Sequence, residues 1–252
     1  MTAPLAGTPT FGAGRAIMIA NLANPTPARA SVAQSQSIDT KRKVESLFGE
    51  NQLAVAVGAG EMEVTGKVEY GKLNPRIWSD IMLGVGSSTG SYAEADGEAG
   101  TVAGTTPYII TVMNSMTFLT DLGVIDVTTG NRMTRVASAP VAAKSYTVAA
   151  GVYTFASGDE GTNKLISYYY TSSTVGETIT ATNQPQGLTG NFQAVHVMPW
   201  GTEQNMVVLN NCLGGSSGLS LKKSGFGSMS LDYTAACDNT GTLGTFSFAE
   251  AA

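Results

Sequence analysis

The segment from Gln52 to Gly84 reads QLAVAVGAGEMEVTGKVEYGKLNPRIWSDIMLG and joins a strand pattern to the signals of a short helix. Polar and apolar side chains alternate without a break from Glu61 to Tyr70. This period of two predicts a strand that has one face in the core and one face in water. The residues expected on the water-facing side are Glu61, Glu63, Thr65, Lys67 and Glu69.

A shorter alternation comes before this strand, where Leu53, Val55 and Val57 are separated by small residues. The glycine-rich segment Gly58-Ala59-Gly60 lies between the two patterns and can form a tight turn. We therefore expect a hairpin that reverses direction at these glycines.

A short helix is predicted after Tyr70 because both of its ends are marked. Asn74 can cap the first free N–H groups, Pro75 suits the first helical position, and Gly84 can adopt the left-handed terminating conformation. A segment this short is not stable alone in water, so it must pack against a sheet. The expected packing stripe is Ile77, Trp78, Ile81 and Met82, with Leu73 and Trp78 as a hydrophobic staple and Arg76, Ser79 and Asp80 facing away.

The composition is that of a β-rich protein with few charges. The chain has 252 residues, of which 42% are hydrophobic and only 13% are charged, and it contains 30 glycines. The net charge of -5 argues against tight, sequence-independent nucleic-acid binding, which depends on clustered Lys and Arg. The single basic cluster, Lys41-Arg42-Lys43, is expected to be a solvated turn.

No apolar run reaches the length of a membrane span, and the N-terminus lacks the pattern of a secretion signal. Synthesis in the cytoplasm is therefore expected. The two cysteines, Cys212 and Cys237, lie in separate β-like segments, and we expect both to be reduced thiols.

Many short strand patterns separated by Gly and Asn turns predict a mainly β fold, a two-sheet antiparallel sandwich or barrel with one short flanking α-helix. Residues 1–30 are expected to form a flexible arm, and residues 31–252 the β domain. Within that domain, residues 124–170 are a possible inserted β module. One of its strands places Ile166, Tyr168 and Tyr170 together in a half-buried layer.

The small and acidic residues from Gly86 to Thr106 predict a long loop. We expect it to contact other subunits, and we expect its deletion to leave a folded monomer that does not polymerise. The candidate contact residues are Ser91, Tyr92, Glu94, Asp96 and Glu98. The three acidic residues in this set can also bind a cation weakly, although a solvated acidic loop is the simpler interpretation.

No catalytic, metal or cofactor motif is found. The only histidine, His196, lies between two valines on a predicted strand, with no nearby nucleophile in a triad spacing. Asp121 and Asp159-Glu160 are interpreted as isolated carboxylates in turns. No dinucleotide or P-loop motif occurs. We therefore expect a protein that is not an enzyme, uses no cofactor and works through its surface.

Three segments, in order along the chain, resemble parts of phage major tail (tail tube) proteins. The first is LFGENQLAVAVGAGEMEVTGKVEY, Leu47 to Tyr70, and the second is GVYTFASGDEGTNKLISYYYT, Gly151 to Thr171. The third combines GNFQAVHVMPW, NMVVLNNCLGG and GSMSLDYTAACDNTGTLGTFSFAE, which lie between Gly190 and Glu250. The segment from Gly86 to Thr106 and the N-terminal arm depart from the pattern of that family.

This resemblance implies a structural virion protein that assembles into hexameric rings stacked as a hollow tube, the conduit for the phage genome. The partners it implies are further copies of the chain, the tape-measure, tail terminator and baseplate proteins, and in some phages a sheath. Phage double-stranded DNA would pass through without specific binding, and Glu61, Glu63, Thr65, Lys67 and Glu69 would be candidates to line the channel. The protein would be made in the host bacterial cytoplasm and reside in the tail, without insertion into a membrane.

Three alternatives remain at this point. A virion decoration protein or a baseplate or tail adaptor can have the same β composition without stacking on itself. A cell-surface adhesion domain and a hydrolase fit the sequence less well.

Overall fold

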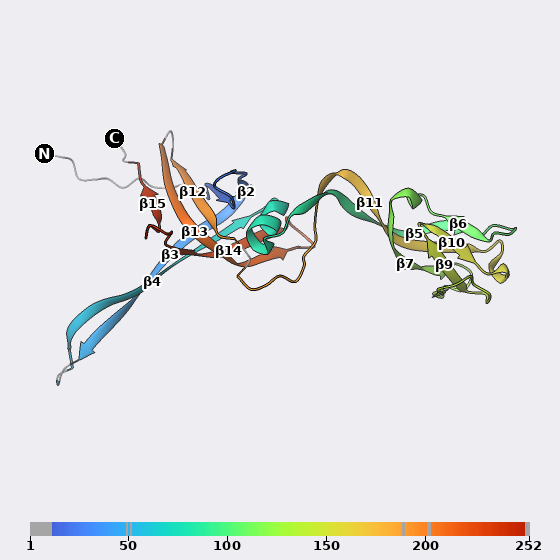
Figure 1. Ribbon diagram of the computed structural model, residues 1–252, viewed down its shortest axis with the longest axis horizontal. Coiled ribbons are helices and arrows are strands. Elements are labelled where there is room, and N and C mark those ends of the chain that lie inside the picture. Colours follow the sequence, from blue (N-terminus) through green and yellow to red (C-terminus); the bar gives the residue numbers. More distant parts are fainter. Residues whose placement is uncertain (1–11, 49, 51, 188–189, 201–202, 250–252) are drawn as a thin grey trace. The chain divides into compact units, whose positions relative to one another are not determined.

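The computed structural model describes residues 12–48, 50, 52–187, 190–200 and 203–249, and the fold is mainly β with antiparallel sheets, as predicted (Figure 1). The chain divides into two compact units. The sheet unit comprises residues 1–87 and 179–252, and the inserted unit comprises residues 88–178. The insertion is therefore wider than the predicted module at 124–170.

The sheet unit is built on one eight-stranded sheet with the order β2-β1-β12-β13-β14-β4-β3, and β15 also pairs with β13. The pairs that join these strands are antiparallel. The strands are β1 (Arg15–Ile19), β2 (Ala28–Ala30), β3 (Ala33–Phe48), β4 (Ala54–Tyr70), β12 (Phe192–Trp200), β13 (Glu203–Ser220), β14 (Ser228–Ala236) and β15 (Gly244–Ser247).

The prediction of a flexible arm over residues 1–30 is wrong for the part that the structure describes. Strand β1 lies between β2 and β12, and its side chains Ala16 and Met18 are buried. The segment from Arg15 to Ile19 is too short to fold alone, but its backbone pairs with β12 and so joins the sheet. Residues 1–11 of the predicted arm lie outside the described part.

The predicted hairpin has a different turn. Strand β4 runs straight through Gly58-Ala59-Gly60, and its hairpin partner is the preceding strand β3. The residues between Phe48 and Ala54 connect the two strands. Gly60 suits this continuous strand because the backbone of β3 lies close beside it: an added Cβ would be 3.1 Å from the Lys43 carbonyl oxygen.

The helix occurs where predicted, between the two marked ends, but with π-helical geometry at η1 (Ile77–Leu83). Asn74 Oδ1 accepts the N–H of Arg76 at 3.1 Å, and Gly84 has a φ of 60° in the left-handed region. Ile77 and Ile81 are buried as expected. Ser79 is also buried, contrary to the prediction, and Leu73 is too exposed to act as a staple.

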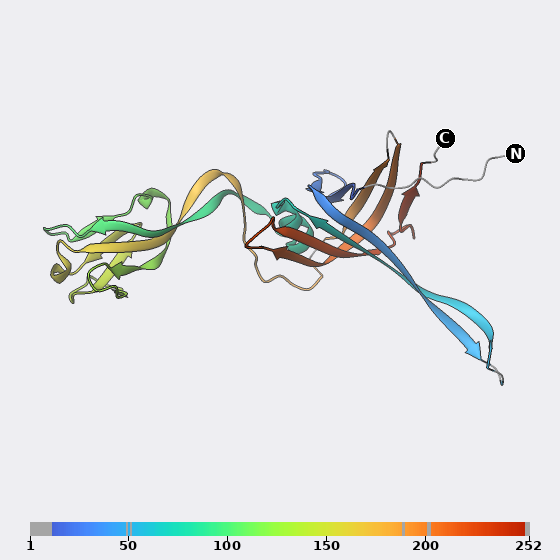
Figure 2. The same cartoon turned by 180° about the vertical axis from the view of Figure 1, so that it is seen from behind.

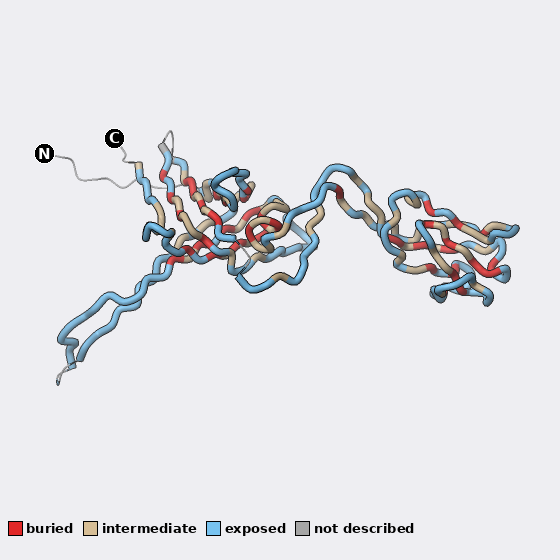
Figure 3. Tube along the Cα trace, in the orientation of Figure 1, coloured by how far each residue is buried: buried red, intermediate tan, exposed pale blue. Residues whose placement is uncertain are grey.

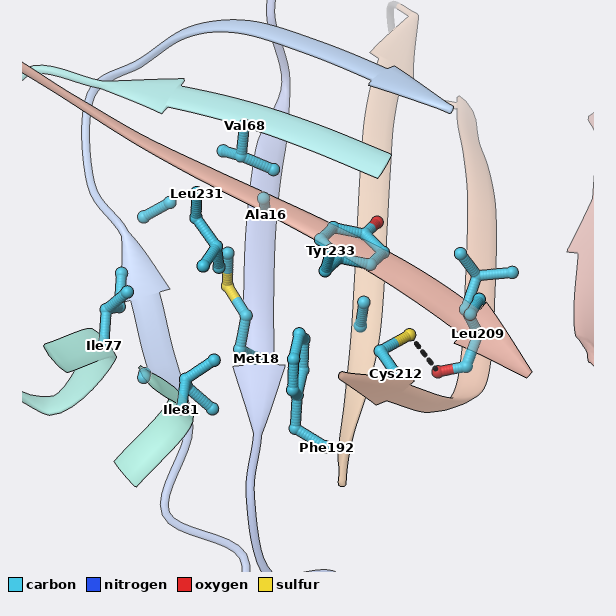
Figure 4. Packing of buried hydrophobic residues seen from close by; sticks show 14 of the residues in the cluster. Ala16, Met18, Val68, Ile77, Ile81, Phe192, Leu209, Cys212, Leu231 and Tyr233 are labelled. Carbon is cyan, nitrogen blue, oxygen red and sulfur yellow. Dashed lines mark hydrogen bonds between the residues drawn. The ribbon is translucent and has the colours of Figure 1, made fainter. Parts of the chain in front are cut away.

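The core of the sheet unit lies between η1 and the inward faces of the strands (Figure 4). Ile77 and Ile81 point toward Met18 and Leu231 in this view, and Phe192 packs edge-on against Tyr233 with ring centroids 5.6 Å apart. This contact network holds the inner half of β4 in the sheet, because Val68 and Tyr70 belong to the same cluster.

The inserted unit contains a three-stranded sheet, order β5-β11-β7, and a four-stranded sheet, order β6-β10-β9-β8. One pair, β8 with β9, is parallel. The elements are β5 (Ser87–Thr101), β6 (Ile109–Thr111), η2 (Ser115–Thr117), β7 (Phe118–Asp126), β8 (Thr134–Arg135), β9 (Ser145–Ala149), β10 (Val152–Phe155), η3 (Ser157–Asp159) and β11 (Asn163–Ile179).

The prediction of a long loop at Gly86–Thr106 is wrong, because most of this segment is strand β5, paired with β11 (Figure 2). The inserted unit also begins and ends on these two strands. Where they meet the sheet unit, Ser88 Oγ donates a hydrogen bond to the Thr178 carbonyl oxygen at 3.3 Å.

A second core holds the two sheets of the inserted unit together. The predicted tyrosine layer is part of it: Tyr168 is buried, and its ring lies 5.8 Å from that of Tyr170. Tyr169 is on the opposite face and is exposed, as a period of two requires.

Candidate assembly surface

The hairpin of β3 and β4 is longer than the sheet that supports it. Strand β14 pairs with β4 only from Val64 to Tyr70. Beyond that point, residues 54–63 of β4 pair with β3 alone among the described residues. Residues 42–48 and 53–62, called the outer hairpin below, therefore form a two-stranded ribbon that extends from the sheet (Figure 1).

The residues of the outer hairpin are exposed (Figure 3), and they include several large apolar ones. Leu53 is 82% exposed, Val55 73% and Val57 66%. On the facing strand, Leu47 is 66% exposed and Phe48 63%. An isolated two-stranded hairpin is marginally stable in water, and an exposed apolar edge readily pairs with another chain. This ribbon thus has both the free backbone edge and the apolar side chains of an association surface.

The base of the outer hairpin is charged instead of apolar. Lys41 is the cross-strand partner of Glu63, and Arg42 is the partner of Met62. A groove of about 700 Å³ lies here, lined by Lys41, Arg42, Lys43, Glu61, Met62, Glu63, Thr234 and Ala235. The basic cluster predicted to be a turn lies on strand β3, although it is solvated as expected.

The five candidate channel residues lie along β4 on the side opposite its buried residues. Glu61, Glu63 and Lys67 are exposed, whereas Thr65 and Glu69 are half-buried. Lys67 Nζ lies 3.5 Å from Glu69 Oε1. The predicted alternation holds from Glu63 to Tyr70. It fails at Met62, expected in the core but exposed, because β14 no longer covers that part of the strand.

The polar face of β4 continues onto its neighbours. Lys67 is the cross-strand partner of Ser37 on β3 and of Asp232 on β14. Asp232 Oδ2 accepts a hydrogen bond from Ser216 Oγ on β13 at 2.8 Å. The five residues are therefore part of a polar surface that spans four strands.

The five residues predicted to form an inter-subunit loop lie on β5, where three of them bind other parts of the inserted unit. Ser91 Oγ is 3.2 Å from Ser172 Oγ. Asp96 Oδ1 accepts from Ser167 Oγ at 3.1 Å, and Glu98 accepts from the N–H of Met113 and the hydroxyl of Tyr168. Tyr92 and Glu94 are exposed. Deleting 86–106 would remove a strand of the inserted unit, so the folded monomer expected from the sequence is not consistent with the structure.

His196 is buried between two neutral partners. Its Nδ1 is 2.8 Å from Gln36 Oε1, and its Nε2 contacts the Tyr233 hydroxyl. Burial lowers the pKa of His196 to about 4, so the imidazole is neutral at pH 7. This arrangement joins β3, β12 and β14 and gives the histidine a structural role.

The carboxylates interpreted as isolated turn residues have buried partners. Asp121 accepts hydrogen bonds from the hydroxyls of Tyr146 and Tyr153 at 2.8 and 2.9 Å. Asp159 is paired with Lys164, which sequence reasoning did not single out. The available signal was the strand period, because Lys164 falls on the same face as Ile166 and Tyr168.

In the part of the chain that the structure describes, no three His, Cys, Asp or Glu side chains are grouped so that they could hold a metal ion. Cys212 is buried and Cys237 is exposed, and both are free thiols. Among the described residues, no helix has the length and apolar character needed to cross a membrane.

Neither a scan against protein-family models nor a search of curated proteins finds a match to this chain. The outer hairpin and the polar face beside it are therefore the features of this chain from which a function can be inferred.

Proposed function

We propose that this chain is a structural virion subunit that assembles with copies of itself into hexameric rings, which stack to form the tail tube of a phage. The observation that carries the proposal is the outer hairpin, a ribbon with exposed leucine, valine and phenylalanine side chains and with no sheet neighbour beyond Val64 among the described residues. Such a surface is costly for a protein that stays single, because it favours uncontrolled association.

Self-association would bury the exposed apolar side chains of the outer hairpin. Covering one of these side chains with a second copy would contribute about 1.5–3 kcal/mol, and several act together, so docking can hold subunits tightly even after the entropy cost of association. When identical contacts close a ring, every hairpin is covered and uncontrolled growth within the ring stops. The low charge of the chain, 13%, agrees with a surface largely covered by neighbours.

The polar face of β4 suits the inside of such a tube. Glu61, Glu63, Glu69 and Asp232 on this face outnumber its two lysines, Lys67 and Lys41, the latter being the cross-strand partner of Glu63. An acidic channel repels phosphate groups, so double-stranded DNA would pass without binding. A map of an assembled tube that places these side chains on its outside would rule out this orientation.

Electron microscopy of the concentrated, purified chain tests the proposal. Open tubes of stacked rings are the expected result, because each copy carries an outer hairpin that a neighbouring copy can cover. Single molecules under all salt conditions and with the baseplate or tape-measure proteins present would contradict the proposal. Discrete rings without stacking would favour a decoration or adaptor protein instead.

A pair of matched variants tests the role of the outer hairpin. Leu53→Asp with Val55→Asp should abolish assembly while leaving the monomer folded, because both side chains are already in water in the monomer. Leu221→Asp is the control, since Leu221 is similarly exposed at 79% but lies outside the hairpin. If the double variant assembles as well as the control, the hairpin is not the assembly surface.

A further inference from the structure

A lysine and two aspartates are buried together in the inserted unit. Lys164 on β11 has no exposed surface, and Asp126 on β7 and Asp159 on η3 are each less than 5% exposed. Lys164 Nζ lies 2.8 Å from Asp126 Oδ2 and 3.2 Å from Asp159 Oδ1. Burying three charges is expensive, and such clusters often contribute little to stability. The arrangement therefore calls for an explanation other than simple ion pairing.

Asp126 is held so that its two oxygens have different surroundings. Oδ2 faces the lysine, whereas Oδ1 accepts the N–H groups of Thr128 and Thr129 at 2.8 and 3.1 Å. The hydrogen bond from Lys164, helped by these two N–H groups, keeps the pKa of Asp126 below its usual range. Two fixed N–H groups on one oxygen are also the geometry that stabilises the oxyanion of a tetrahedral intermediate.

Asp159 completes the cluster from the other side of the amine. Its Oδ2 accepts the N–H of Lys144 at 2.9 Å, which leaves Oδ1 directed at Lys164 Nζ. A carboxylate in this position can accept a proton from the amine and return it to a leaving oxygen. The cluster therefore contains an amine, a carboxyl group with an oxyanion-stabilising pair, and a proton carrier.

We propose that Lys164 and Asp126 condense into an isopeptide bond, with Asp159 as the general acid and base. Holding an amine and a carboxyl group in contact replaces a bimolecular encounter with an intramolecular one, which greatly accelerates their condensation. The reaction needs to occur only once in each chain. It is independent of the assembly proposed above.

The step balances without any further reactant. The ammonium of Lys164 first gives a proton to Asp126 Oδ2, and the resulting amine attacks Cγ of Asp126. The C=O electron pair moves to Oδ1, beside the Thr128 and Thr129 N–H groups. Asp159 takes a proton from the nitrogen and gives it to Oδ2, the Cγ–Oδ2 bond breaks, and water leaves. An amide and the regenerated Asp159 carboxylate remain.

Asp126 is the better acyl donor of the two aspartates for three reasons. It lies closer to the amine, and its outer oxygen has two N–H donors where that of Asp159 has one. It is also the cross-strand partner of Lys164, so the bond ties β7 to β11, whereas a bond to Asp159 would close only a short local loop. With either aspartate, the product replaces a buried ion pair with a neutral amide.

Intact mass spectrometry of the purified full chain tests the proposal directly. The expected mass is one water below that of the sequence, and proteolysis should release a branched peptide that joins the segments containing Asp126 and Lys164. A folded chain of full sequence mass after prolonged incubation would overturn the proposal. A branch at Asp159 instead of Asp126 would overturn the assignment of the acyl donor.

Variants separate this bond from other losses of water. The Asp96-Gly97 pair can lose water by cyclising, but this loss would persist in Lys164→Arg, whereas loss through the isopeptide bond would not. Asp126→Asn should form the same amide with loss of ammonia in place of water. Asp159→Asn should keep the full mass, and water loss at the normal rate in that variant would rule out its role as proton carrier. The branched peptide of the unmodified chain remains decisive if a variant fails to fold.

Discussion

The two halves of β4 have similar sequence patterns but very different surroundings. The inner half, Val64 to Tyr70, lies between β3 and β14, and every second side chain is buried. The outer half, Ala54 to Glu63, has only β3 beside it, and all of its residues are exposed. The alternation of polar and apolar residues therefore shows which face of β4 can be buried. Whether that face is buried in the monomer depends on the presence of β14 beside it.

This difference separates the residues that fold the protein from those that stay in water in the monomer. Val68 and Val55 are both strand valines, yet Val68 is fully buried and Val55 is 73% exposed. Burial of the Val68 side chain stabilises the folded monomer. Val55 would give a similar free-energy gain only if a partner covered its side chain. Four experiments test whether the two halves differ in this way.

The largest effect is expected from placing a charge in the inner half. Val68→Asp buries an unpaired carboxylate in the core of the sheet unit and should lower the free energy of unfolding by about 4 kcal/mol or more. Val55→Asp, the matched change in the outer half, should stay within about 0.5 kcal/mol. Denaturant titration followed by circular dichroism measures both. Similar losses in the two variants would mean that the outer half also has a folding partner.

Acid should weaken the sheet unit through His196, whose partner Tyr233 lies across from Gly66 in the inner half. The folded-state pKa of His196, about 4, is below its ordinary value of 6.5, so the unfolded chain binds the proton more readily. The stability from the neutral histidine is therefore complete above pH 6.5 and is lost as the pH falls toward 4, by about 3 kcal/mol in total.

The variant His196→Gln has no titrating group at this position and provides the control for the acid effect. Its unfolding free energy should change less than that of the unmodified chain between pH 6.5 and 4. Thermal or denaturant unfolding at a series of pH values measures this difference. Identical pH profiles for the two proteins would show that another group controls the acid response.

Two glycines on β4 give a smaller and more local test. A Cβ added at Gly66 would lie 2.1 Å from the Tyr233 ring, so Gly66→Ala should cost about 1–3 kcal/mol through overpacking. A Cβ at Gly58 meets nothing closer than 4.0 Å, so Gly58→Ala should be neutral or stabilising by up to about 1 kcal/mol. Unfolding midpoints measure the pair, and a reversed order would contradict the division of the strand.

The smallest effect is expected at the ion pair on the outer hairpin. Lys43 Nζ lies 2.7 Å from Glu45 Oε1, but both side chains are about two-thirds exposed. Exposed pairs of this kind contribute little, so Lys43→Ala should change the unfolding free energy by less than about 0.5 kcal/mol. A loss above 1 kcal/mol would indicate that the ribbon is stabilised in the monomer by its charges.

Local features of the fold were predictable from sequence, and long-range pairing was not. The alternation at Val64–Tyr70 and the helix ends at Asn74 and Gly84 depend on neighbouring residues, so the pattern was sufficient. Strand β5 was missed because its glycines and acidic residues have low strand propensity, and pairing with β11 overrides that preference.

The same limit applies to the candidate surface and to the buried cluster. Leu53 and Val55 were expected in a hairpin, but their exposure follows from where β14 ends, which no local pattern records. The alternating pattern of β11 already placed Lys164 on the buried face of the strand. Its partner Asp126 is 38 residues earlier in the chain, so only the folded structure brings the charges together.

The hydrogen bond between Ser88 and Thr178 shows that the chain leaves and re-enters the sheet unit at neighbouring points. The inserted unit therefore begins and ends at adjacent points in space, as a loop connecting two neighbouring strands would. Its length and content can thus vary through recombination without disturbing the strands on either side. The same two positions form a natural grafting point for a foreign domain whose two ends are adjacent.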